Sequence, residues 1–219
     1  QDNLFRGIHF DVAVEDPQNA AAIKTMVSVF LCPADLAPSA AFAVPDGFGQ
    51  TLAQAAPSSY AACVGGDESA PTGPDGLGIF YRNSATRFAD ISDGTSNTIM
   101  IGERAWGNAN GIWAGAINNA VIMRGAQNPC PGSGASFYPA AVLVQAHGHL
   151  NNATTDTDGG LDDFSSPHSS GSNFVFADGS VRFLRSIPGD LANGDYAPES
   201  LILQALSTRA SGEDVPFDF

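Results

Sequence analysis

The sequence has 219 residues, enough for one full-sized domain with its own hydrophobic core. Hydrophobic residues make up 43% and charged residues 15%, which is typical of a globular protein and not of a disordered one. With 23 acidic residues against 9 basic ones, the net charge of −14 excludes nucleic-acid binding, which needs cations to neutralise phosphates. Adhesion to an anionic membrane surface is excluded for the same reason. The acidity suits solubility or a divalent cation partner.

The N-terminal region predicts a short helix followed by a strand. Asp16 is a suitable N-cap and Pro17 a suitable first helical residue, so we expect a helix that continues through Met26. The apolar, β-branched run 27–32 predicts a buried strand, which Pro33 ends. Because the sequence starts abruptly at Gln1, we expect an N-terminal piece to precede it.

The middle of the sequence alternates short strands with long loops. Residues 34–78 are rich in Ala, Pro, Gly and Ser, which predicts irregular coil around one strand at 59–64. The turn formers of 90–97 precede an apolar run. Further strands are expected at 79–82, 98–103, near Trp113 and at 121–123.

Two apolar, aromatic runs, 173–177 and 180–184, flank Asp178-Gly179. This pattern predicts a hairpin with a type I′ turn, in which both central residues have positive φ. A helix is expected at 200–208. The sequence therefore predicts an α+β fold in one domain over residues 1–219: a mostly antiparallel sheet with long loops, a short N-terminal helix and a C-terminal helix.

The spacing of His168, nine residues and Asp178-Gly179 resembles the signature of the prepilin-type processing-associated H-x9-DG domain family, whose proteins are uncharacterised and abundant in planctomycete-type bacteria. Four further blocks resemble the family in the same order along the chain: Phe30-Leu31-Cys32-Pro33-Ala34-Asp35; the block 90–99 with Gly102-Glu103-Arg104; Phe164-Ser165-Ser166-Pro167-His168; and the block 206–213.

The resemblance implies a protein of the bacterial envelope, secreted or on the cell surface. Family members begin with a type IV prepilin leader and a long hydrophobic helix used for assembly, and this sequence shows neither. We therefore expect the globular head of a non-enzymatic pilin- or pseudopilin-like subunit of a filament, layer or secretion-associated assembly. Its expected partners are further copies or other pilin-like subunits, and it would reach the membrane only through the missing helix.

The cysteines Cys32, Cys63 and Cys130 form no C-x-x-C pair, so a structural zinc site of that kind is not indicated. By resemblance, Cys32 pairs with a cysteine of the missing helix, which leaves Cys63 and Cys130 as a second pair. Cys32–Cys63 is the alternative within this chain, and the sequence does not choose between them.

His168 is interpreted as a structural latch that bonds backbone or Asp178 where the hairpin begins, because the sequence shows no catalytic partner for it. Asp90, Asp93 and Asn97 are interpreted as a capped turn that leads into strand 98–103, with cation binding as the alternative.

A cell-surface binding module for calcium or carbohydrate is the alternative function. Asp156, Asp158, Asp162 and Asp163 are candidate calcium ligands beside Gly159-Gly160, although the segment lacks the final glutamate of an EF-hand loop. His147 and His149 could bind zinc if His168 or Glu103 supplied a third ligand. Aromatic residues that could stack on sugars are Trp106, Trp113, Tyr60, Tyr81 and Tyr138.

Overall fold

The computed structural model describes residues 1–66, 76–81, 83–126, 135–136, 142–146, 150, 160–185 and 198–213. Its centre is a five-stranded sheet in the order β7-β3-β4-β8-β9. The strands are β3 (Tyr60–Gly65), β4 (Ile99–Glu103), β7 (Leu143–Gln145), β8 (Gly171–Phe176) and β9 (Val181–Arg185). All neighbours pair antiparallel except β3 and β7, which are parallel. The predicted α+β class with a mostly antiparallel sheet is confirmed.

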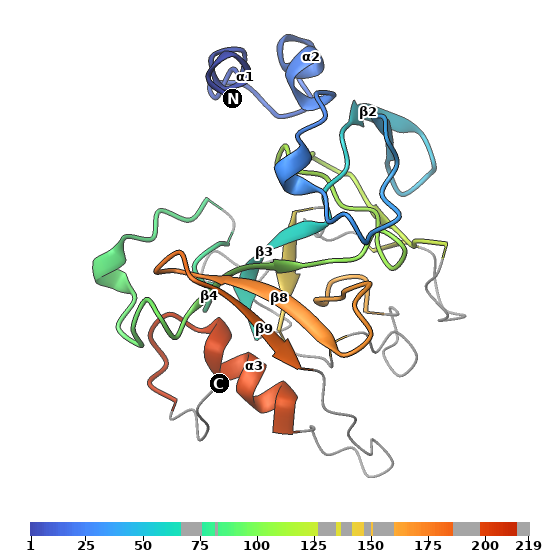
Figure 1. The fold of residues 1–219 in the computed structure, drawn as a ribbon. Helices are drawn as coiled ribbons and strands as arrows, with labels where there is room; N and C mark the ends of the chain where they lie inside the picture. The colour runs from blue at the N-terminus through green and yellow to red at the C-terminus, as the bar shows by residue number, and fades with distance from the viewer. Residues whose placement is uncertain are drawn as a thin grey trace.

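The two faces of this sheet differ because side chains alternate along each strand. On the inner face, Cys63, Phe174 and Phe176 are fully buried and pack with Leu203 and Leu206. These leucines belong to the predicted C-terminal helix, α3 (Pro198–Ser207), which lies beside β8 and β9 in Figure 1. The outer face carries half-buried side chains.

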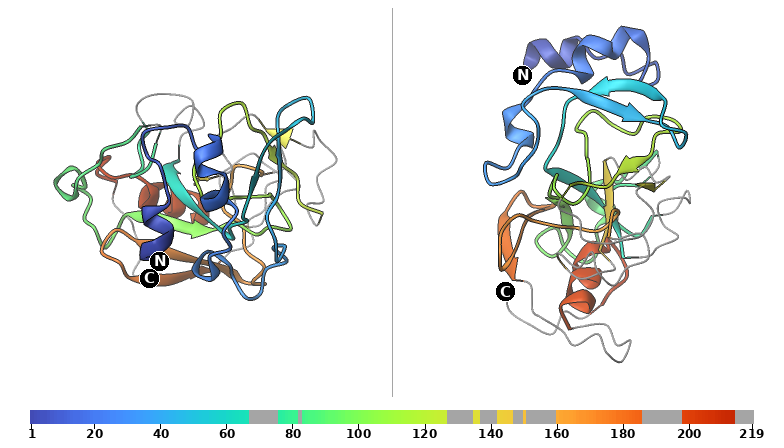
Figure 2. Two further views of the ribbon diagram at one scale, coloured as in Figure 1. Left: turned by 90° about the horizontal axis from the view of Figure 1, so that it is seen from above. Right: turned by 90° about the vertical axis from the view of Figure 1, so that its right-hand side faces the viewer.

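The N-terminal part of the chain lies at the end of the molecule opposite α3 (Figures 1 and 2). It contains α1 (Asp2–Arg6), the 3-10 helix η1 (Pro17–Asn19), α2 (Ala20–Ile23) and the two-stranded sheet of β1 (Phe42–Pro45) and β2 (Thr51–Ala55). A second core cluster of Val44, Ala55, Ile112, Ile117 and Ala120 anchors this sheet. The remaining elements are η2 (Ser28–Phe30), η3 (Phe88–Asp90) and the short strands β5 (Ile122–Met123) and β6 (Ala135–Ser136).

The start of the predicted N-terminal helix is confirmed, but its length is not. The Asp16 side chain accepts a hydrogen bond of 2.9 Å from the backbone N of Gln18, and Pro17 follows as the first helical residue. The helical turns end at Ile23, with Lys24 as C-cap, whereas the prediction extended to Met26.

Three predicted strands are wrong. Residues 28–30 form the 3-10 helix η2, in which Phe30 N donates to Val27 O and the Val29 side chain is exposed. Val29 and Phe30 line a surface groove, described below, whereas Val27 and Cys32 are buried outside any strand. Residues 79–81 and Trp113 also lie outside strands.

The predicted hairpin of β8 and β9 is confirmed, but its turn is not of type I′. Phe176 N donates to Ser180 O and Gly179 N donates to Phe176 O, so three residues, 177–179, connect the strands. Only Gly179 has positive φ, at 84°, and Asp178 does not. This geometry fits a type I turn followed by a left-handed glycine, a common three-residue hairpin loop.

Candidate functional site

Glu103 places a buried carboxylate at the end of β4, where its side chain is 2% exposed. Its Oε2 accepts hydrogen bonds from Ser166 Oγ at 2.9 Å, Ser172 Oγ at 3.3 Å and Asn173 N at 2.7 Å. Asn173 Nδ2 lies 3.2 Å from Oε2 and 3.3 Å from Oε1. These donors come from β8 and from the segment before it, so they fix the orientation of the carboxylate.

His168 lies over this carboxylate, with Nε2 3.3 Å from Glu103 Oε1. Its backbone N donates to Ser166 Oγ at 3.2 Å, and its side chain is 35% exposed. The expected contact with Asp178 is replaced by this contact with Glu103, because the Asp178 carboxylate accepts from Ser180 N at 2.8 Å within its own turn.

Cys32 completes the cluster from a distant part of the sequence. Its Sγ lies 3.8 Å from His168 Nε2, and the residue is buried. Burial raises the pKa of the Cys32 thiol, and the nearby Glu103 carboxylate adds to that rise although a hydrogen bond from backbone near Ala34 opposes it. The ligand-type atoms of Cys32, Glu103 and His168 all lie within 4.8 Å of one another.

The alternative Cys32–Cys63 disulfide is not formed, and both residues are free thiols. Cys63 lies in β3 on the inner face of the sheet, where it packs in the main core, whereas Cys32 lies against Glu103 and His168. A pair of Cys63 with Cys130 is likewise not formed, and Cys130 itself lies outside the described residues.

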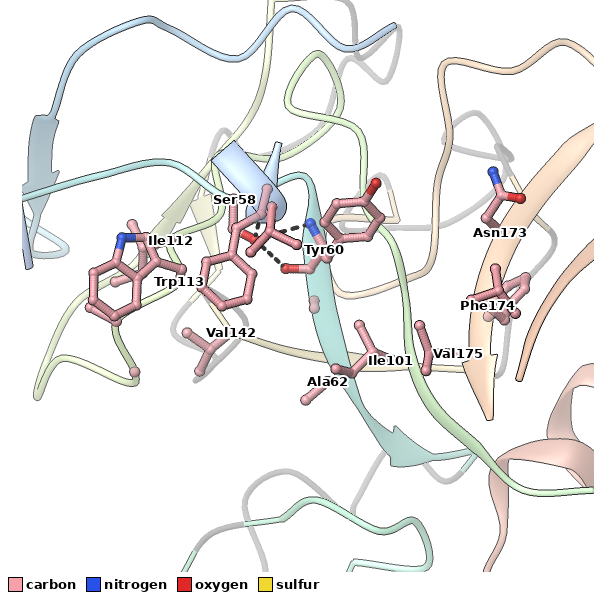
Figure 3. Close-up of a pocket in the computed structure, with 16 residues that line it drawn as sticks. Ser58, Tyr60, Ala62, Ile101, Ile112, Trp113, Val142, Asn173, Phe174 and Val175 are labelled. Carbon is pink, nitrogen blue, oxygen red and sulfur yellow. Dashed lines mark hydrogen bonds between the residues drawn. The ribbon is translucent and has the colours of Figure 1, made fainter. Parts of the chain in front are cut away.

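An apolar groove adjoins the cluster on the outer face of the sheet. Its volume is about 580 Å³. Figure 3 shows Trp113 and Val142 toward one end, Asn173 and Val175 toward the other, and Ile101 between them. Asn173 also contacts Glu103, so it joins the groove to the cluster. Tyr60 also lines the groove and lies opposite Glu103 in the pairing of β3 with β4. Burial raises the pKa of its phenol, and the charges of Cys32 and Glu103 raise this pKa further.

The walls of the groove are partly exposed. Val29 and Val181 are 73% and 65% exposed, although both line the groove. The Trp113 ring stacks on Phe30 at a centroid distance of 5.9 Å, and its Nε1 donates to Thr25 O at 3.0 Å. Trp113 therefore anchors a loop and forms part of the wall at the same time.

The acidic turn 90–97 contacts the chain that follows α3. The Asp93 carboxylate accepts hydrogen bonds from Ser211 N at 2.8 Å and Gly212 N at 3.0 Å. Asn97 Nδ2 donates to Asp93 O at 3.3 Å. Asp90 instead pairs with Arg87, whose hydrogen bonds lower the pKa of the Asp90 carboxyl. In the structure, these residues therefore hold the turn and the chain after α3 in place through hydrogen bonds and an ion pair.

Two of the four candidate calcium ligands, Asp162 and Asp163, are buried. Asp162 Oδ2 accepts a hydrogen bond of 3.0 Å from Gln145 Nε2. Burial lowers the pKa of the neighbouring Arg104 to about 9, while the charge of Asp162 acts in the opposite direction. Asp156, Asp158, His147 and His149 lie outside the described residues, so calcium binding stays a prediction.

A family model described as a protein of unknown function (DUF1559) matches residues 1–187. The chain belongs to the DUF1559 family. This is the family of the H-x9-DG type, so the resemblance of the sequence motifs is confirmed at that level. No curated protein and no solved structure matches the chain. Among the described residues, no helix of this DUF1559 protein is long and apolar enough to cross a membrane.

Three of the sequence blocks typical of the DUF1559 family lie next to one another in the structure. Cys32, Glu103 and His168 lie in three different blocks of the sequence resemblance, and the fold brings these blocks together. Sequence reasoning named Glu103 only as an optional zinc ligand and treated Cys32 as a disulfide candidate. The one sequence signal that could have indicated this cluster was that each of the three residues falls within a block matching the family. Their spacing along the chain does not indicate contact.

Proposed function

We propose that this chain is the globular head of a non-enzymatic, pilin-like structural subunit that self-associates in an extracellular assembly. The observation that supports this most is the apolar groove on the outer face of the sheet, beside Val29 and Val181. An exposed apolar surface of this kind costs solubility unless another protein surface covers it.

The lining of the groove suits a protein surface better than a polar substrate. Ile101, Val142 and Val175 contribute aliphatic side chains to it. The Ser58 hydroxyl, which also lines it, donates to Tyr60 O at 2.7 Å and accepts from Tyr60 N at 3.1 Å. Its hydrogen-bonding capacity is largely used within the chain, whereas apolar contact remains available.

A second copy of the chain is the proposed occupant because the groove continues to a sheet edge. β9 is the last strand in the order of the sheet, and its Val181 and Phe183 side chains are exposed. An edge strand offers unpaired backbone groups to another chain. Edge pairing and groove filling together would extend one subunit onto the next, as a filament or layer requires.

Concentration-dependent association is the test, measured by light scattering after size exclusion and by electron microscopy. Because the net charge of −14 makes copies repel one another, association should increase when salt screens that charge. Val29→Asp and Val181→Asp should both weaken it. Leu201→Asp is the matched control, since Leu201 is an exposed hydrophobic residue on α3. A chain that stays monomeric at all salt and protein concentrations contradicts the proposal.

Carbohydrate binding is the second candidate, favoured by the presence of both Tyr60 and Trp113 on the groove. Stacking of a sugar on Trp113 would change its fluorescence. Titration with bacterial surface oligosaccharides therefore tests this alternative, and an unchanged emission with every sugar would exclude it.

A further inference from the structure

We propose that Cys32, Glu103 and His168 form a binding site for a divalent cation of the zinc class. The inference goes beyond self-association and does not depend on it. It rests on the convergence of three ligand atoms, on the chemistry of those atoms and on the hydrogen bonds that hold the carboxylate.

The separations of the ligand atoms match a zinc coordination sphere. Zinc bound tetrahedrally at about 2.3 Å from sulfur and about 2.0–2.1 Å from nitrogen or oxygen separates two such ligands by about 3.3–3.6 Å. The structure has 3.3 Å between His168 Nε2 and Glu103 Oε1, and 3.8 Å between His168 Nε2 and Cys32 Sγ. The third pair, Cys32 Sγ and a Glu103 carboxylate oxygen, lies within 4.8 Å, so a shift of about 1 Å or less would bring all three atoms into tetrahedral distance of one ion.

The same geometry argues against a cysteine nucleophile with a histidine base. In such a relay, the nucleophile contacts one imidazole nitrogen and the orienting carboxylate contacts the other. Here both Cys32 and Glu103 approach Nε2. A neutral imidazole has at most one proton on Nε2 and can donate it to only one of them. An ion at the centre of the three atoms satisfies all of them at once.

The donor set selects the class of metal. One thiol sulfur, one imidazole nitrogen and one carboxylate oxygen are ligands that zinc and related transition metals share. Calcium and magnesium prefer oxygen ligands in greater number. The 35% exposure of the His168 side chain leaves room for water as a fourth ligand.

Glu103 already has the outer hydrogen bonds that metal-binding carboxylates usually have. Its Oε2 accepts hydrogen bonds from Ser166, Ser172 and the backbone of Asn173, while Oε1 is the oxygen nearest His168. The carboxylate is therefore oriented before an ion arrives. Since Cys32 lies two residues after Phe30, which with Val29 lines the groove, an ion here would also fix one wall of the groove.

The site can be tested on the whole chain, freed of metal with a chelator and kept reduced. Titration with Co²⁺ should produce the intense thiolate-to-metal absorption and the visible bands of a tetrahedral site, saturating at one equivalent. Zn²⁺ at a hundredfold excess over its dissociation constant should raise the melting temperature by about 5–10 °C. Ca²⁺ and Mg²⁺ should not compete with Co²⁺ for this site.

Cys32→Ser should abolish the thiolate absorption, and His168→Gln should lower the affinity at least tenfold. His9→Gln is the matched control, because His9 is exposed and its backbone, not its ring, bonds Asn19. Circular dichroism without metal checks that each variant is folded. The proposal fails if the wild-type chain gives no thiolate absorption with Co²⁺. It also fails if Cys32→Ser and His168→Gln bind as the wild type does, since the ion would then be held elsewhere, for instance by His147 and His149.

Discussion

The imidazole of His168 contacts the carboxylate of Glu103 across 3.3 Å, so the signature histidine of the family is joined to the central strand β4. The Asp-Gly turn, the other half of that signature, has its own hydrogen bond from Ser180 to Asp178. The two halves of the motif therefore act at different places: one holds the beginning of the hairpin to the sheet, and the other shapes its turn.

Glu103→Leu should lower the free energy of unfolding by about 2–4 kcal/mol, because it removes the acceptor of the buried Ser172 hydroxyl and of the partly buried Asn173 backbone N–H. Glu103→Gln should cost less, since one side-chain oxygen remains. Urea denaturation of metal-free protein measures both. The exposed Asp11 supplies the control Asp11→Leu, which should leave stability nearly unchanged. Equal effects at the two positions would contradict the assigned role.

Gly102→Ala should destabilise the sheet by about 1–3 kcal/mol through overpacking. A Cβ at this position would lie 2.7 Å from a ring carbon of Phe174 and would also overlap the ring of Phe164. These rings pack edge to face, with centroids 5.0 Å apart, and have no space to retreat within the core. Thermal unfolding measures the loss, with Gly7→Ala as a control at a helix end where the added carbon meets nothing closer than 3.4 Å.

Alkaline pH should weaken the fold through Cys63. Complete burial raises the pKa of its thiol from 9.0 to about 12. Between these values the unfolded chain releases the proton while the folded chain retains it, so stability falls as pH rises. The contribution is about 1.4 kcal/mol per pH unit in that window.

Denaturant unfolding of the wild type and of Cys63→Ala between pH 9 and 12 isolates this contribution. Other groups that titrate in the same range, Arg104 among them, contribute to both proteins and cancel in the difference. The gap in stability between the two proteins should narrow as pH rises. A constant gap would show that the Cys63 thiol titrates alike in both states.

Gly179→Ala should cost about 1 kcal/mol, because φ is 84° there and a side chain strains that conformation. Nothing lies within 4 Å of the added carbon, so packing does not contribute. Gly179→Asn should cost less, since asparagine tolerates left-handed backbone better. Unfolding midpoints that rank Gly, Asn and Ala in that order would confirm the turn geometry; equal midpoints for Asn and Ala would count against it.

Local signals in the sequence predicted the parts of the fold that local forces decide. The apolar runs around Asp178-Gly179 gave the hairpin, and Asp16-Pro17 gave the start of the N-terminal helical turns. The turn type was wrong because Asp-Gly also suits a three-residue loop with a single left-handed residue. The strand predicted at 27–32 was wrong because apolar character does not distinguish a buried strand from a 3-10 turn that has some side chains in the core and others in a groove wall.

The candidate site required contacts that no local pattern encodes. Cys32 and His168 are 136 residues apart. From the sequence alone, Cys32 is interpreted as a disulfide partner and His168 as a structural latch. Glu103 ends a strand that otherwise looks like core, so its five hydrogen bonds become visible only once β4 is paired with β8 and the segment before β8 is placed. The contact among these three residues therefore depends on long-range strand pairing, which the sequence pattern does not reveal.

The order of strands also constrains how the chain can fold as it is made. β4 needs β8 as a neighbour, with Gly102 opposite Phe174, but residues 171–176 are synthesised long after β4. β3 likewise waits for β7, since Ala62 pairs with Leu143. Within the described part of this sheet, β3–β4 and β8–β9 join strands that are consecutive in the sequence, and the β8–β9 hairpin emerges near the end. The main sheet can therefore be completed only after residues 171–185 have been made, so β4 lacks its β8 neighbour during much of synthesis.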